Sequence, residues 1–175
     1  SIVLVLQGFI FNIGRHHTDS NEYVKMIWFN LSDDEKQYLL FETAKCSIYL
    51  ADVQNYIGRC ILVLNRHCGS LSELSLDEWI ESKEIINKIE HCYKIVLGAE
   101  LCNWSCLLNN FYKSEVPDPH LHIHVRPRYR KPVIINNHVY VDSEFGHHYA
   151  VGKADEISEE DRLSLFQLLK NFGGK

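Results

Sequence analysis

The stretch Pro119–Arg128 alternates histidine and apolar residues at a strict period of two. Successive side chains of a β-strand point to opposite faces of a sheet, so the pattern predicts a strand with histidines on one face and a core on the other. Neighbouring imidazoles on such a face lie about 7 Å apart and repel one another when protonated, so three together indicate a functional surface. The histidines are His120, His122 and His124, and the aliphatic residues are Leu121, Ile123 and Val125.

The chain of 175 residues is most simply interpreted as one folded domain over residues 31–175, preceded by an extension over residues 1–30. Its formal net charge of −5 lacks the basic signature of a dedicated nucleic-acid-binding module. No run reaches the roughly 18 consecutive apolar residues of a membrane-spanning helix. The six cysteines include no Cys-x2-Cys pair, so we expect reduced thiols in a cytoplasmic protein without membrane association.

A capping box marks the start of the longest predicted helix. Ser75 is followed three residues later by Glu78, and the helix is expected over residues 76–97, ending before Gly98. Apolar residues at helical spacing predict the side that faces the core. They are Trp79, Ile86, Ile89, Tyr93 and Val96.

Two further helices and a hairpin are predicted near the ends of the domain. The stretch Ser32–Glu35 has capping-box spacing and predicts a short helix over residues 33–43. Ser158, with Asp161 three residues on, predicts the start of a C-terminal helix. Asn136-Asn137 stands between two β-prone runs and predicts a hairpin turn.

The remaining strands place polar residues near the histidine strand. The runs Cys46–Ala51 and Arg59–Leu64 are β-prone, and a polar turn between them predicts an antiparallel pair. Another strand is expected over Trp104–Leu108, followed directly by Asn109 and Asn110. Antiparallel pairing would bring these two amides to the start of the histidine face, where they could bind what the histidines act on. The elements together predict an α+β fold.

Two classes of site explain the histidine face incompletely. His-x-His is a zinc-ligand spacing, but three histidines on one strand spread over about 13 Å, too far for one tetrahedral ion. No carboxylate or cysteine stands at a ligand-like interval nearby, so we predict no metal and no cofactor. An anion-binding module would use the adjacent cations, but it leaves the regular alternation unexplained. Those cations are Arg126, Arg128, Arg130 and Lys131.

Nucleophilic catalysis is the third class. A neutral imidazole can attack phosphorus and form a covalent nucleotidyl-histidine if one ring nitrogen is held as a donor by a fixed acceptor. Flanking donors must also neutralise the phosphoryl oxygens. The central His122 has partners on both sides, so His120 and His124 can orient it and donate to phosphate.

These motifs resemble the histidine triad (HIT) family of nucleotide hydrolases and transferases. His120–Val125, followed by Arg126-Pro127-Arg128, resembles the family's His-φ-His-φ-His-φ-φ signature, where φ is apolar. Gly58–His67 is similar to the family's Gly-His-x-Leu-Val-x-Pro-Lys-x-His strand, and the similarity covers about residues 44–130. Pro127–Pro132 with Phe145–Tyr149 is similar to a prokaryotic-type branch of HIT-like proteins.

The resemblance implies a half-barrel antiparallel sheet with one long helix, assembled as a homodimer that acts on a purine nucleotide. It implies His122 as the nucleophile, His124 as a phosphate donor and His120 as support for the orientation of His122. Asp52 matches the position that holds the ribose hydroxyls, and Asn109 or Asn110 matches the amide near the phosphate. We add Arg59 and Arg128 as phosphate-binding candidates.

Two positions depart from the family pattern. Arg59 replaces the upstream active-site histidine, and it can bind phosphate but cannot shuttle a proton. Val116–Pro119 replaces the usual hydroxyl or Gln-Ser element before the triad. The leading hypothesis is a hydrolase of nucleoside phosphoramidates, dinucleoside polyphosphates or related bonds, with nucleotidyl transfer as a variant. The alternative is a nucleotide-binding regulatory protein with a degenerate site, and a third hypothesis is a metal protein.

Overall fold

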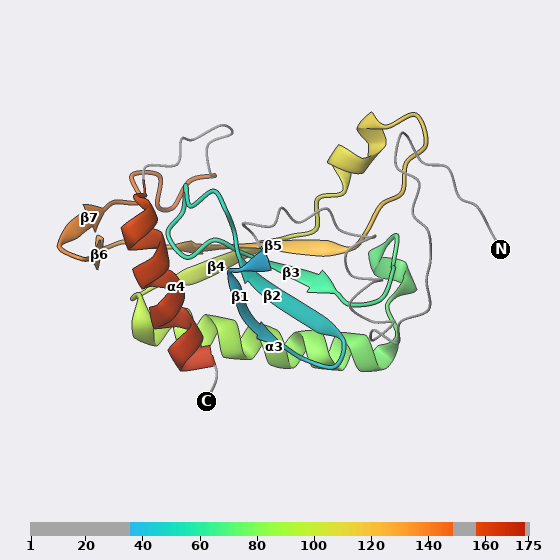
Figure 1. The fold of residues 1–175 in the computed structure, drawn as a ribbon, viewed down its shortest axis with the longest axis horizontal. Coiled ribbons are helices and arrows are strands. Elements are labelled where there is room, and N and C mark those ends of the chain that lie inside the picture. The colour runs from blue at the N-terminus through green and yellow to red at the C-terminus, as the bar shows by residue number, and fades with distance from the viewer. Residues whose placement is uncertain (1–35, 149–156, 174–175) are drawn as a thin grey trace, which may run out of the picture.

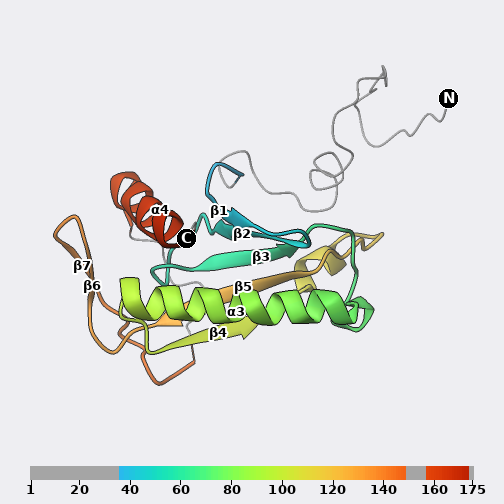
Figure 2. The ribbon, with the colours of Figure 1, turned by 90° about the horizontal axis from the view of Figure 1, so that it is seen from below.

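A computed structural model describes residues 36–148 and 157–173 of the chain. In the described part, five antiparallel strands form one sheet in the order β1-β2-β3-β5-β4, and the long helix α3 lies across one face (Figures 1 and 2). The strands of this sheet are β1 Leu39–Glu42, β2 Cys46–Leu50, β3 Cys60–Leu64, β4 Leu101–Ser105 and β5 His122–Arg128. The predicted α+β fold is confirmed. The predicted extension over residues 1–30 lies outside the described residues.

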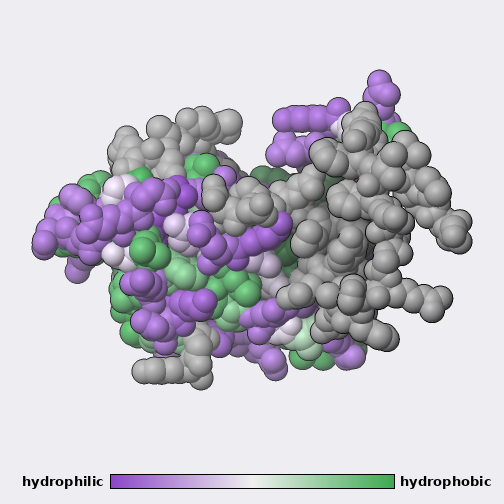
Figure 3. Space-filling view, in the orientation of Figure 1, coloured by the Kyte–Doolittle hydropathy of each residue, from purple (hydrophilic) through white to green (hydrophobic). Residues whose placement is uncertain are grey.

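The other elements bounded within the described residues are two 3-10 helices, two α-helices and a hairpin. They are η1 Leu71–Glu73, α3 Leu76–Val96, η2 Asn109–Lys113, β6 Val133–Ile135, β7 His138–Tyr140 and α4 Glu159–Gly173. Helix α4 packs against α3 and β1 beside the sheet, and hydrophobic and hydrophilic areas alternate on the surface seen in Figure 3. None of the helices in the described ranges is long and apolar enough to span a membrane.

The core lies between α3 and one face of the sheet. Ile48 of β2 pairs with Leu62 of β3, which pairs in turn with Ile123 of β5, so these residues share a face. Ile89 and Tyr93 of α3 are buried in the same cluster. All six cysteines are free thiols, and four are buried, as expected for reduced cysteine acting as a small apolar residue. The opposite face of the sheet is therefore the one that carries the histidines.

The capping box at the start of α3 is confirmed. The hydroxyl of Ser75 accepts from the backbone N–H of Glu78, and the Glu78 carboxylate accepts from the N–H of Ser75 at 2.8 Å. The predicted core stripe is only partly right, because Trp79 is 47% exposed. Near the start of the helix, Glu78 and Ile85 are buried in place of the predicted Trp79 and Ile86. One residue turns an α-helix by about 100°, so Trp79 and the half-buried Ile86 point away from the core. The buried positions are Glu78, Ser82, Ile85, Ile89, Cys92 and Tyr93.

The helix predicted over residues 33–43 is wrong in its C-terminal part: residue 36 is helical, but the helix does not continue to residue 43. Residues 39–42 form strand β1, with Phe41 opposite Ile48 and Glu42 opposite Ser47 of β2. The capping-box spacing is a local signal, whereas pairing with the edge of β2 satisfies backbone groups that are far along the chain.

The C-terminal elements follow the sequence signals. Asn136 and Asn137 have φ angles of 49° and 67°, which is the left-handed pair that a two-residue hairpin turn requires. The backbone N–H of Asp161 donates to the Ser158 hydroxyl at 3.1 Å, which confirms the predicted cap. The Asp161 carboxylate also accepts from Asn136, His138 and Tyr140, so one buried carboxylate ties the hairpin to α4.

Arg128 fastens the segment after the hairpin to the end of β5. Its guanidinium donates to both carboxylate oxygens of Asp142, at 2.6 and 3.1 Å, and to the backbone carbonyls of Glu144 and His147. The side chain also lies over the ring of Tyr56 at 5.0 Å. Because Arg128 is only 2% exposed, this ion pair is buried.

Replacing Arg128 with alanine should lower the free energy of unfolding by about 3–5 kcal/mol, because the Asp142 carboxylate would stay buried without its partner. Urea denaturation of both proteins measures the difference. The matched control is Arg130→Ala, whose ion pair with Glu100 is largely exposed and should contribute less than about 1 kcal/mol. Equal losses in the two variants would contradict the structural role of Arg128.

Candidate active site

The histidine strand runs between β3 and β4. His122 lies opposite Val63, and His124 lies opposite Ile61 of β3 and Ser105 of β4. Strand β5 begins at His122, so His120 stands just before it. The ring centroids of His122 and His124 are 4.9 Å apart, which confirms that these imidazoles share a face. This face lies on the side of the sheet away from α3.

The ring of His122 is oriented by a backbone carbonyl. Its Nδ1 lies 3.0 Å from the carbonyl oxygen of His120. A carbonyl oxygen only accepts, so Nδ1 carries the proton and Nε2 carries the lone pair. Burial lowers the pKa of His122 below its ordinary value of 6.5, while this hydrogen bond partly opposes the shift. His122 is therefore neutral near neutral pH, with Nε2 available as a nucleophile.

His120 connects the start of the strand to β3. Its Nε2 donates to the carbonyl of Leu64 at 2.9 Å, and its ring stacks on His67 with centroids 5.7 Å apart. Burial lowers the pKa of His120 to about 4. His120 thus contacts His122 through its backbone carbonyl, while its imidazole is bonded to β3; its predicted role in orienting the nucleophile stays a prediction.

His124 is half-buried, and the charges of two arginines act on it. Burial is the largest cause that lowers its pKa to about 3, followed by the charges of His122, Arg59 and Arg126. Its Nδ1 is buried and has no hydrogen-bond partner among the described residues. A neutral His124 can still donate one hydrogen bond, so it fits the predicted role of phosphate donor.

The β2–β3 loop brings Asp52 and Arg59 to the end of the histidine face. Asp52 is exposed, and its Oδ1 accepts from the backbone N–H of Val53 at 2.7 Å. Nη1 of Arg59 donates to the carbonyl of Val53 at 3.1 Å. Asp52 and Arg59 are thus both bonded to the backbone of Val53. Arg59 is also close enough for its charge to act on His124.

Gln54 and Gly58 give this loop its shape. The buried amide of Gln54 donates to the carbonyls of Ala51 and Arg59 and accepts from the N–H of Gly58. Gly58 has a φ of 87°, and a Cβ there would lie 3.0 Å from a methyl of Leu97. Sequence reasoning missed Gln54, because one polar residue in a polar loop gives no signal of burial.

The two asparagines lie on η2 rather than at the end of a strand. Strand β4 covers Leu101–Ser105, so it begins and ends three residues earlier than the strand predicted over Trp104–Leu108. Helix η2 brings Phe111 against His122 with ring centroids 5.8 Å apart. Asn109 and Asn110 begin this short helix and are exposed. The prediction that they contact phosphate stays a prediction.

The arginines of β5 differ from expectation. The donors of Arg128 are bound to Asp142 and to carbonyls, so we leave it out of the proposed phosphate site. The period of two puts Arg126 on the face of His122 and His124, in the position next to His124. Its Nη1 donates to the hydroxyl of Ser105 at 3.2 Å. Extending the alternation of the histidines by two positions along β5 would have pointed to Arg126 as a candidate site residue.

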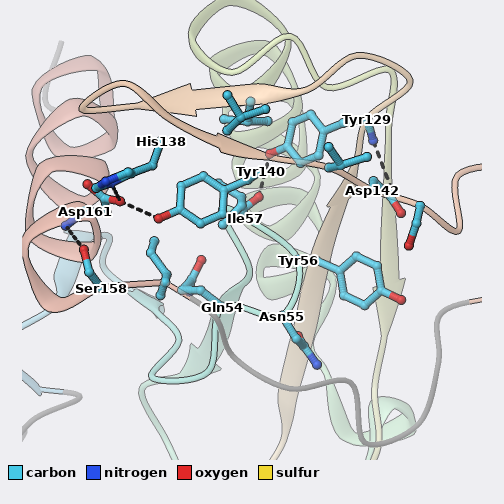
Figure 4. A pocket seen from close by; sticks show the side chains of 15 residues that line it. Gln54, Asn55, Tyr56, Ile57, Tyr129, His138, Tyr140, Asp142, Ser158 and Asp161 are labelled. Atoms are coloured by element: carbon cyan, nitrogen blue, oxygen red, sulfur yellow. Dashed lines mark hydrogen bonds and ion pairs between the residues drawn. The ribbon is translucent and has the colours of Figure 1, made fainter.

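A sizeable cavity of the described residues lies elsewhere. It has a volume of about 720 Å³ and opens between the β2–β3 loop, the β6–β7 hairpin and the start of α4 (Figure 4). Its polar groups mostly bind one another: Tyr129 donates to the carbonyl of Ile57, and Tyr140 and His138 share the Asp161 carboxylate. Within residues 36–148 and 157–173, no group of three or more potential ligands is arranged to hold a metal ion. The chemistry is therefore best placed on the histidine face.

Comparison with known proteins identifies the fold. No protein-family model and no curated protein sequence matches the chain. Solved structures do match. A histidine triad (HIT) protein from Sinorhizobium meliloti is 19% identical, with a TM-score of 0.58 over 84% of this chain and 98% of its own. A Hit-like protein involved in cell-cycle regulation from Bartonella henselae is 13% identical, with a TM-score of 0.57 over 90% and 99%.

A third similar structure is a hypothetical histidine triad nucleotide-binding protein from Sulfolobus tokodaii. It is 15% identical, with a TM-score of 0.54 over 78% of this chain and 83% of its own. The chain therefore has the HIT-like fold that its triad and upstream strand predicted.

The three imidazoles should resist protonation. Nuclear magnetic resonance titration should place the midpoints near pH 4 for His120, near pH 3 for His124 and below pH 6.5 for His122. Variants with each histidine replaced by glutamine assign the signals. A midpoint at or above 6.5 for any of them would contradict the buried, neutral arrangement.

The free energy of unfolding should depend on pH through the protonation of these histidines. The unfolded chain binds protons at these histidines near pH 6.5, whereas the folded chain does so only at lower pH. Their contribution to stability is thus fully present above pH 6.5 and is lost as the pH falls from 6.5 towards 3. Urea denaturation between pH 7 and pH 4 should show this loss, and the His120→Gln variant should show a smaller one.

Proposed function

We propose that this protein is a nucleotidyl hydrolase in which Nε2 of His122 attacks the phosphorus of a nucleotide. The observation that carries the proposal is the 3.0 Å hydrogen bond from Nδ1 of His122 to the carbonyl of His120. It leaves the Nε2 lone pair available in a buried ring that is neutral near neutral pH. The histidine triad protein from Sulfolobus tokodaii, which shares this fold, is described as nucleotide-binding.

The reaction would run in two displacements. In the first, the Nε2 lone pair forms a bond to phosphorus, and the leaving group departs with the electron pair of its broken bond. In the second, water attacks phosphorus, the N–P bond breaks, and its electron pair returns to Nε2. Solvent takes the proton lost by water, and the products are a nucleoside monophosphate and the leaving group. An acceptor other than water would make the same chain a nucleotidyl transferase.

The surrounding residues suit a phosphate and a nucleoside. The ring of His124 lies beside that of His122, with centroids 4.9 Å apart, and a ring N–H of the neutral imidazole can donate to a phosphoryl oxygen. Asn109 and Asn110 begin η2, the helix whose Phe111 contacts His122, so their amides are candidates for a second donor. Arg59 supplies positive charge on the other side of His124, where β3 begins.

The nucleoside would lie towards β2. Asp52 is exposed in the β2–β3 loop, where its carboxylate can accept from ribose hydroxyls. Ile61 and Val63 form a small apolar cluster with Tyr49 on the histidine side of the sheet, which suits a purine base. We extend the proposal to a homodimer, because β4 is an edge strand of the five-stranded sheet and Leu101 on it is exposed.

Replacing His122 with alanine should lower turnover of labelled adenylyl compounds by at least about 10³-fold, because the nucleophile is lost. The panel includes an adenosine phosphoramidate and a dinucleoside polyphosphate. Acid quenching of the wild type should trap a protein-bound nucleotidyl group, detected by mass spectrometry, and His122→Ala should carry none. The control is His148→Ala, an exposed histidine outside the proposed site. Equal turnover by wild type and His122→Ala would exclude the proposal.

A second candidate function is a nucleotide-binding regulatory protein. Arg59 stands where the resembled family has an active-site histidine, and Val116–Pro119 has no hydroxyl before the triad, which favours binding without turnover. Calorimetry would then detect nucleotide binding, while no compound of the panel is hydrolysed. Hydrolysis that depends on His122 would exclude this alternative.

A further inference from the structure

His122 is largely closed off from solvent, although the proposed reaction requires access to it. Only 7% of the residue is exposed. The ring of Phe111 stands against its imidazole, with centroids 5.8 Å apart and ring planes at 63°. Such edge-to-face contacts attract the two rings beyond the area that they bury. A nucleophile attacks only an atom that comes within about 3.5 Å of it, so part of this cover must move before a substrate reacts.

Most of the described surroundings of His122 are fixed. Strand β5 is paired on both sides, to β3 and to β4, so the imidazole cannot move away with its strand. Its Nδ1 is held at 3.0 Å from the carbonyl oxygen of His120. The β2–β3 loop is fastened by the three backbone hydrogen bonds of Gln54. Among the described segments, this leaves the connection between β4 and β5 as the part that can move.

The middle of that connection, residues 109–118, is called the lid segment below. All of its residues are exposed except Phe111, which is half-buried. In Figure 1 its yellow helix η2 rises away from the sheet next to the start of β5. The backbone N–H of Phe111 donates to the carbonyl of Leu108 at 3.1 Å, and that of Ser114 donates to the carbonyl of Phe111 at 3.3 Å. Such local bonds are kept when a segment swings as a unit, so opening costs little beyond the contact of Phe111.

Both ends of the lid segment are fastened to the body of the protein. Before it, Ser105 at the end of β4 pairs with His124. At its far end, a carboxylate oxygen of Asp118 lies 3.1 Å from Nε2 of His67. A segment that is held at both ends and exposed in between can open without disturbing the sheet. Phe111 is the side chain through which this segment covers the nucleophile.

We propose that Phe111 is the gate of the active site: it closes the lid segment over His122, and a nucleotide must displace it before Nε2 can reach phosphorus. The displacement by a nucleotide rests on the proposed function of His122, whereas the closed lid does not. Asn109 and Asn110, the candidate phosphate donors, begin the same short helix, so they move together with the gate. A nucleotide that contacts these amides while Phe111 is displaced stabilises the open state.

Chemical modification tests the gate without any nucleotide. Diethyl pyrocarbonate acylates neutral imidazoles that it can reach, and tandem mass spectrometry measures the rate at each histidine. Relative to the exposed His148 of the same protein, Phe111→Ala should raise the rate at His122 at least about tenfold, because the cover is removed. Phe111→Tyr keeps the ring and should stay within about twofold of the wild type. The matched control is Tyr112→Ala, which removes the exposed neighbouring ring of the same helix.

The gate predicts a change at His122 alone. The imidazole of His120 is bonded to the carbonyl of Leu64, so its rate should be the same in the wild type and in Phe111→Ala. An unchanged rate at His122 would overturn the proposal. An equal rise at His120 would overturn it as well, because it would show a general loosening of the sheet.

Nucleotide binding distinguishes a gate from a ring that holds the substrate. AMP should bind Phe111→Ala at least about threefold more tightly than the wild type in calorimetry, because it no longer has to displace the ring. Weaker binding would show that Phe111 contacts the nucleotide, and it would overturn the proposal.

The gate and the proposed hydrolase can fail separately. If nucleotides are hydrolysed through His122 but its acylation rate is the same in the wild type and in Phe111→Ala, the gate is wrong and the hydrolase stands. If acylation of His122 depends on Phe111 but no nucleotide is hydrolysed, the hydrolase is wrong and the closed lid stands.

Discussion

The position of every imidazole on the histidine face depends on the burial of the opposite, apolar face of β5. Leu121 and Val125 are almost completely buried against α3, so the apolar half of the alternation holds the strand in one register between β3 and β4. A slip by one residue would turn the histidines into the core and the aliphatic residues to the surface, which makes the register strongly specified. The same register places the carbonyl of His120 within hydrogen-bond distance of His122.

Charge on this face is divided between two kinds of side chain. Burial keeps His120, His122 and His124 neutral at neutral pH, while Arg59 and Arg126 carry permanent positive charge. A nucleophile needs a lone pair and a phosphate needs positive charge, and one protonated imidazole could not provide both. This division explains how closely spaced histidines are tolerated on one strand and how a face of a chain with net charge −5 can suit an anion.

Residues outside the face hold its borders in place. Gln54 fixes the β2–β3 loop that carries Asp52 and Arg59, through three hydrogen bonds to the backbone. Arg128 fixes the segment around Asp142 at the far end of β5. Each is a buried polar side chain whose partners lie within the protein, and such networks specify one arrangement when they are fully satisfied.

The sequence by itself determined the elements whose signals are local. The alternation at 119–128, the capping boxes that begin at Ser75 and Ser158, and the turn at Asn136-Asn137 each depend on residues within a few positions of one another. Only the tertiary structure decided that residues 39–42 form a strand, because β2 offers them an edge to pair with. It also decided that Arg126 of β5 donates to Ser105 beside the histidines, whereas Arg128 is held by Asp142, fourteen residues further along. Such partners are chosen by the fold, so a local pattern carries no information about them.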